Sequence, residues 1–134
     1  QAIKLSADLL SEAISHLKHN LIIRDQASEL FAQERNADFL NSIFGNVMQS
    51  FGGNDVYETV EQKAAHLLYF MVKNHPFVDG NKRCGAFAFV WFLSQAKFLN
   101  KSRINPSSLT ALTILVASSD AKDKDKIIPL IITS

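Results

Sequence analysis

The chain has 134 residues, of which 47 % are hydrophobic, so it has the length of one domain and enough apolar residues for a sizeable core. Its 14 basic residues nearly balance its 13 acidic ones and are dispersed, which argues against a nucleic-acid-binding surface. It has one cysteine, no apolar run of about 18 residues and no signal-peptide pattern, which excludes an internal disulfide and a membrane span. We therefore expect residues 1–134 to form a single domain in the cytoplasm. Because the sequence begins with glutamine, a fragment of a longer chain is an alternative.

Two helical patterns precede residue 52. Ser6 is placed to cap a first helix. The apolar residues on one face of this helix are Leu9, Leu10, Ile14, Leu17 and Leu21. A second helical region is predicted through residues 27–51, broken near Asn36. The apolar residues that recur every four positions in it are Phe39, Ile43, Val47 and Phe51.

A turn and a capping signal separate this region from the next helix. Residues 52–56, GGNDV, stop a helix and turn the chain, because glycine and Asn-Asp favour turns. Thr59 and Gln62 fit a capping box that opens a third helix. This helix should end before Pro76, since the residue before a proline resists helical backbone. The residues expected to point inward from it are Ala64, Leu67, Leu68, Met71 and Val72.

The C-terminal half is also helical by pattern. A helix is predicted to begin near Asn81, and its CGAFAFVWFL stretch is apolar on every side, which is typical of a centrally buried helix. Asn105 and Pro106 fit the cap and first position of another helix. Alternating charges at 121–126 fit a solvated helix start, and the KIIPLII run that follows can be helix or strand. The expected fold is all-α, with about six helices around a central buried helix.

The loop ahead of the apolar helix has the composition of an anion site. Residues 75–87 read HPFVDGNKRCGAF. A helix that begins near Asn81 presents free N–H groups and the positive end of its dipole, which suit a phosphate. Gly80 lets a ligand approach the backbone closely. Lys82 and Arg83 add positive charge, and a guanidinium can bind a phosphate through two hydrogen bonds.

Two further residues of the loop suggest chemistry rather than binding alone. Asp79 would repel a phosphate unless a cation lies between them, and Mg²⁺ bridging the carboxylate and phosphate oxygens removes the conflict. His75 is then a candidate general base, because an imidazole can be neutral at cellular pH. The simpler alternatives are that Asp79 caps the following helix and that His75 is an exposed loop histidine without a role. Cys84 is expected to be a small buried residue, and His66 to lie on the rim of its helix.

HPFVDGNKR resembles the signature loop of the Fic/Doc family, whose pattern is H-x-F-x-D/E-G-N-G-R-x-x-R. The matching residues are His75, Phe77, Asp79, Gly80, Asn81 and Arg83. The resemblance implies the Fic fold and the transfer of AMP from ATP to a Ser, Thr or Tyr hydroxyl of a target protein. It implies that His75 is the base, that Asp79 holds Mg²⁺ and that Phe77 anchors the loop in the core. The residues it assigns to phosphate binding are Gly80, Asn81, Lys82 and Arg83.

Two positions depart from the pattern. Lys82 stands where the pattern has its second glycine, and Ala86 where it has its last arginine. Lysine at that position is similar to the Doc branch, which transfers the terminal phosphoryl group, but Doc has alanine where this chain has Gly80. We favour AMP transfer because Gly80 is retained. The alternatives are a Doc-like protein kinase and a catalytically degenerate binding module of a toxin–antitoxin system.

The segment at 41–56 occupies the place of the family's flap, a short hairpin that would bind the target as an added strand. The residues expected to dock the target are Phe51, Gly52, Gly53, Asn54, Asp55 and Val56. Phe44 and Phe51 can equally be core residues at a helix end. The family's inhibitory signature, Ser or Thr four residues before a glutamate, is absent, so an inhibitory partner or a missing inhibitory segment would restrain any activity. We expect no nucleic-acid or membrane partner.

Overall fold

Helices dominate the computed structural model, which describes residues 5–96 and 106–133. Its helices are α1 (Ala7–Ile23), α2 (Phe39–Met48), α3 (Val60–Asn74), α4 (Asn81–Gln95), α5 (Pro106–Ser118) and α6 (Lys124–Thr133), with a short 3₁₀ turn η1 (Ala121–Asp123) before α6. Between α2 and α3 lies a small antiparallel hairpin of β1 (Ser50–Phe51) and β2 (Asn54–Asp55). The predictions of an all-α fold, of about six helices and of a short hairpin ahead of the helix that leads into the loop, α3, are confirmed.

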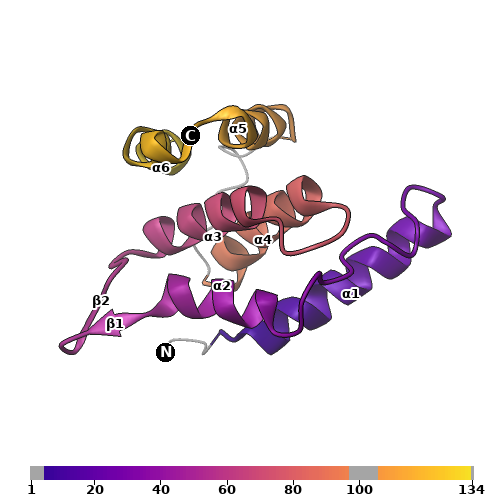
Figure 1. The fold of residues 1–134 in the computed structure, drawn as a ribbon, viewed down its shortest axis with the longest axis horizontal. Helices are drawn as coiled ribbons and strands as arrows, with labels where there is room; N and C mark the ends of the chain where they lie inside the picture. Colours follow the sequence, from indigo (N-terminus) through magenta and orange to yellow (C-terminus); the bar gives the residue numbers. More distant parts are fainter. Residues whose placement is uncertain (1–4, 97–105, 134) are drawn as a thin grey trace.

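The pair of α3 and α4 forms the centre of the molecule (Figure 1). α3 contacts α2 on one side and α5 and α6 on the other, and α4 lies along it. Leu67, Leu68 and Met71 of α3 are fully buried, as the predicted inward face requires. On α4 the burial is less complete, because Phe87 and Trp91 are partly exposed. α4 is therefore a core helix with one partly open side, which its apolar sequence did not indicate.

The predicted ends of the helices are confirmed by their caps. The Ser6 side chain accepts a hydrogen bond from the Leu9 N–H at 3.2 Å. Thr59 and Gln62 form the full capping box at the start of α3, with each side chain bonded to the other's backbone. α3 ends at Asn74, two residues before the proline. Asn105, predicted to cap α5, lies outside the described residues.

The second predicted helical region is wrong in its first half. Residues 27–38 form turns and isolated bridges, and α2 begins only at Phe39, after Asp38 in the left-handed conformation (φ 64°). The physical reason is that the backbone of residues 31–35 pairs with the loop at 76–79 and cannot make helical bonds as well. Phe51 also lies beyond α2, on the hairpin, whereas Phe44 is buried in the core.

The C-terminal run adopts the helical alternative. KIIPLII lies in α6, with Pro129 inside the helix, and the charged residues before it form η1 and the first turn of α6. Ile127, Ile128 and Ile131 face the core. Among the described helices, none combines the length and the hydropathy that crossing a bilayer requires.

Candidate functional site

The loop of residues 75–80 joins the end of α3 to the start of α4 through two left-handed residues. His75 follows α3 with φ 52° and ψ 61°, and Gly80 precedes α4 with φ 86°. No side chain caps the N-terminus of α4, so Asp79 does not cap the helix. The first turn of α4 therefore keeps backbone N–H groups and the positive end of its dipole for another acceptor.

The shape of this loop is set by Asn81. Its Oδ1 accepts a hydrogen bond from the Phe77 N–H at 2.9 Å, and its Nδ2 donates to the Phe77 carbonyl at 2.9 Å. The Phe77 ring is buried, as an anchor of the loop should be. Because the Asn81 amide is occupied in this way, a phosphate at this point would meet its backbone N–H rather than its side chain. Nδ2 also lies 3.4 Å from Nδ1 of His75.

A second stretch of chain braces the loop from outside. We call residues 26–35 the bracing segment. Three backbone bonds join Ala32 to Asp79 at 2.9 Å, Val78 to Gln33 at 2.8 Å, and Arg35 to Pro76 at 2.9 Å. The Arg35 side chain also donates from Nε to the Phe77 carbonyl at 3.1 Å. Helical periodicity gives no signal for such long-range pairing, so no residue of this segment was predicted to lie at the site.

Phe31 of the bracing segment touches the motif directly. Its side chain is fully buried, and Cζ of Arg83 lies 4.6 Å from the centre of its ring. A methyl group at Gly80 would come within 2.5 Å of two ring carbons, Cδ1 and Cε1. Arg83 also donates from Nη1 to the Gln26 carbonyl at 2.8 Å, and its Nη2 lies 3.9 Å from Oδ2 of Asp79. Arg83 is thus held by groups on three sides.

The charged residues of the loop remain accessible. His75, Asp79, Lys82 and Arg83 are all exposed to solvent, so a ligand and a target side chain can reach them. Cys84, one position on, is fully buried, and burial raises the pKa of its thiol to about 12. It is therefore not a nucleophile, in agreement with its predicted core role.

A model of the Fic/DOC family matches residues 7–93, well over half of the chain. The chain belongs to the Fic/DOC family. Neither the comparison with curated proteins nor that with solved structures found a match. The family includes enzymes that transfer nucleotide groups to protein targets, and the matched region contains the whole loop, the bracing segment and both helices that hold them.

In this Fic/DOC chain the hairpin and the loop lie at opposite ends of α3 (Figure 1). The 15 residues of α3 separate them by about 20 Å along the helix axis. The hairpin residues 50–56 are exposed, and 86 % of the surface of Phe51 is open to solvent. The structure therefore does not bring the residues predicted to dock a target next to His75, and the segment beside the loop is the bracing segment.

The hairpin is tied to α3 and α6 by a cluster of aromatic and basic residues. Lys63 pairs with Asp55 of β2 at 3.0 Å and donates to the Tyr57 carbonyl. The Tyr57 ring stacks on His66 with centres 3.6 Å apart, and Nζ of Lys124 lies 5.7 Å from the Tyr57 ring. The expectation that His66 lies on the rim of its helix is wrong, because it is 93 % buried under Tyr57, a residue outside the helix that periodicity cannot place.

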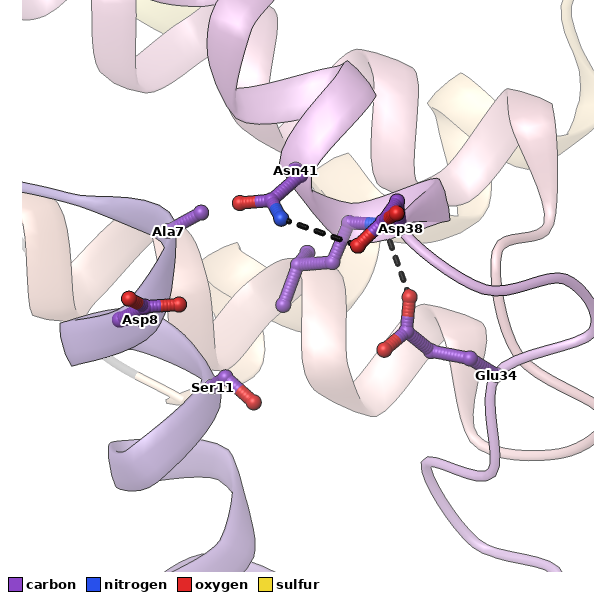
Figure 2. Close-up of a pocket in the computed structure, with 7 residues that line it drawn as sticks. Ala7, Asp8, Ser11, Glu34, Asp38 and Asn41 are labelled. Atoms are coloured by element: carbon purple, nitrogen blue, oxygen red, sulfur yellow. Dashed lines mark hydrogen bonds between the residues drawn. The ribbon is translucent and has the colours of Figure 1, made fainter.

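A cavity of about 160 Å³ lies between the N-termini of α1 and α2 and contains no residue of the loop (Figure 2). Its lining residues are Ala7, Asp8, Ser11, Glu34, Asp38, Leu40 and Asn41. Three of its polar side chains already make hydrogen bonds within the protein, because Glu34 accepts the Leu40 N–H at 3.0 Å and Asn41 donates to Asp38 at 3.3 Å. No cluster of three metal-binding side chains exists in the described part of the chain, so its acidic lining is not a metal centre.

Proposed function

We propose that the chain transfers AMP from ATP to a Ser, Thr or Tyr hydroxyl of a target protein, with Mg²⁺. One observation carries the proposal: an uncapped helix N-terminus with an exposed histidine, carboxylate and arginine around it, in a loop braced by a second segment. Fixed N–H groups of this kind stabilise the charge that develops on a reacting phosphate. The nucleotide phosphates would bind at Gly80–Arg83, mainly through the backbone and the Arg83 side chain.

His75 would act as the general base. It would accept the proton of the target hydroxyl, whose oxygen attacks the α-phosphorus of ATP while the bond to the bridging oxygen breaks and pyrophosphate leaves. In the structure Nδ2 of Asn81 faces Nδ1 of His75, which places the proton of a neutral ring on Nε2. Proton acceptance at Nε2 requires the other tautomer. We propose that the long 3.4 Å contact opens when the substrates bind.

Asp79 fits a magnesium ion that the nucleotide brings with it. Mg²⁺ is commonly held by one or two carboxylates together with substrate phosphates, and Asp79 is an exposed carboxylate beside the α4 N-terminus. Among the described residues Asp79 belongs to no group of three potential metal ligands, so phosphate oxygens would have to supply most of the coordination of such an ion. The ion would neutralise phosphate charge. Asp79 also lies 3.9 Å from Nη2 of Arg83, so the two opposite charges would attract each other across the phosphate site.

Lys82 supports a second candidate, transfer of the terminal phosphoryl group. It is exposed in the first turn of α4, where a cation opposes the helix dipole unless an anion is bound. Ala86, one turn later in α4, carries no charge, so Lys82 supplies the positive charge close to the loop. A triphosphate bound with its outer end toward Lys82 would present the γ-phosphorus to His75.

The approach to His75 limits how a target can dock. Val78 of the loop is 43 % exposed and lies beside the bracing segment, so a target segment would contact these residues. The hairpin residues 51–56 remain a proposed docking element only for parts of the target about 20 Å from the modified hydroxyl. A target protein, and an inhibitory partner or a segment outside this sequence, are the partners we propose.

Labelled ATP distinguishes the two reactions. The protein is incubated with Mg²⁺ and with α-labelled or γ-labelled ATP, alone and with cell lysate. AMP transfer predicts label on protein from the α-position only, and phosphoryl transfer from the γ-position only. The His75→Ala variant must lose the label in either case. Label from neither position would contradict both reactions, and the absence of ATP binding by calorimetry at millimolar nucleotide with Mg²⁺ would support the binding module.

A further inference from the structure

We infer that Phe31 is a positioning residue, which holds the Arg83 guanidinium in the plane from which it binds the nucleotide phosphates; this inference rests on the proposed function. Phe31 lies 44 positions from the first residue of the motif and belongs to a segment without regular structure. Its side chain is nevertheless fully buried. Gly80 and Arg83 of the loop motif lie against the Phe31 ring.

The ring offers Arg83 a flat surface. At 4.6 Å from the ring centre, the guanidinium is attracted by the negative face of the ring. A ring below Cζ does not compete for the N–H groups at the rim of the guanidinium, because those groups donate hydrogen bonds in the guanidinium's own plane. Arg83 is also about half exposed, so those groups can reach a ligand.

The other contacts of Arg83 do not fix this plane. Nη1 donates to the Gln26 carbonyl at 2.8 Å, which restrains one corner of the group but allows rotation about that bond. The carboxylate of Asp79 is 3.9 Å from Nη2, beyond hydrogen-bonding distance. The Phe31 ring, whose centre is 4.6 Å from Cζ, is then the contact that we infer limits the remaining rotation, and Gly80 leaves the space that the ring needs.

A double-mutant cycle on nucleotide affinity tests this role. The dissociation constant of Mg·ATP is measured by calorimetry for wild type, Phe31→Leu, Arg83→Ala and the double variant, with Phe31→Met as a second variant if leucine leaves the chain unfolded. Leucine and methionine keep an apolar side chain and remove the ring face. We expect Phe31→Leu to weaken binding about tenfold in the wild-type background, since a contact of about 1–2 kcal/mol would favour the binding orientation of Arg83 in the free protein by about that factor. In the Arg83→Ala background we expect no further loss.

Two controls separate this role from general packing. Phe92→Leu truncates an equally buried phenylalanine of α4 that packs on Phe44, so it should lower stability and leave affinity unchanged. Arg83→Gln, which removes the cation and keeps hydrogen-bonding groups, replaces Arg83→Ala if the alanine variant binds too weakly to measure. Equal loss from Phe31→Leu in both backgrounds, or no loss at all, would overturn the inference while leaving the proposed function intact. If wild type itself binds no Mg·ATP at millimolar concentration, the proposed function fails first, and the inference fails with it.

Discussion

Replacing Gly80 with alanine should destabilise the fold more than replacing any other glycine in a turn. Gly80 has φ 86°, and a Cβ there would lie 2.5 Å from Cδ1 and Cε1 of the buried Phe31 ring. Carbon atoms do not approach so closely, and the ring has no free space to move into because it is fully buried. The substitution therefore adds a steric cost to a conformational one.

The two costs can be separated within the chain. Alanine in the left-handed region costs about 1–2 kcal/mol, and overpacking a core adds about 1–3 kcal/mol. Gly80→Ala should thus lower the free energy of unfolding by about 2–5 kcal/mol, a large part of the total of a small domain. Gly53 has the same φ of 86° with no atom within 4 Å of its would-be Cβ, so Gly53→Ala should show the conformational cost alone.

Urea unfolding followed by the fluorescence of Trp91, the one tryptophan, measures the difference. Combining Gly80→Ala with Phe31→Leu should recover part of the excess, because leucine vacates space beside residue 80. If Gly80→Ala costs no more than Gly53→Ala, the Phe31 contact does not constrain this position and the reasoning is refuted.

Three other outcomes follow from the structure. Burial, with a smaller contribution from Lys124, lowers the pKa of His66 below its ordinary 6.5. As the pH falls below 6.5, the unfolded chain therefore binds more protons than the folded one, and the free energy of unfolding should decrease. A His66→Gln variant should flatten this dependence, measured by urea unfolding between about pH 8 and 5. Because the pKa of the Cys84 thiol is raised to about 12 and the side chain is buried, N-ethylmaleimide at neutral pH should label it in urea but not in the folded protein, as mass spectrometry would show. Thr59→Ala removes one half of the capping box and should lower the unfolding free energy by about 0.5–2 kcal/mol in urea titration, whereas Thr110→Ala, an exposed position within α5, should change it little.

The sequence was most informative where local chemistry decides structure. The capping box of Thr59 and the Pro76 stop fix both ends of α3, and the spacing of HPFVDGNKR places His75 and Asn81 at the facing ends of α3 and α4. These signals act within a few residues along the chain. They located the loop and its exposed charged side chains correctly, but not the use of the Asn81 amide, which closes on Phe77 instead of facing a ligand.

Contacts between distant segments were not predictable in the same way. The stretch at 27–38 contains good helix formers, yet its backbone pairs with residues more than forty positions away, and tertiary pairing overrides a weak local preference. The hairpin lies between α2 and α3, and α3 leads into the loop at residues 75–80. This order in the sequence suggested that the hairpin lies next to His75. The length of α3 instead carries it to the opposite end. His66 shows the same limit, because Tyr57 covers it from outside the helical pattern.

The two departures from the family pattern are related by the geometry of α4. Lys82 and Ala86 are four residues apart and so lie on one face of the helix. Relative to a pattern with glycine and arginine at these positions, the chain keeps one cation on this face but places it one turn, about 5 Å, nearer the loop. The charge available to a triphosphate is therefore retained, while the point at which it is offered moves toward His75. Under the proposed function, these two positions therefore bear on the direction in which a triphosphate would lie, and the comparison of α-labelled with γ-labelled ATP measures that direction.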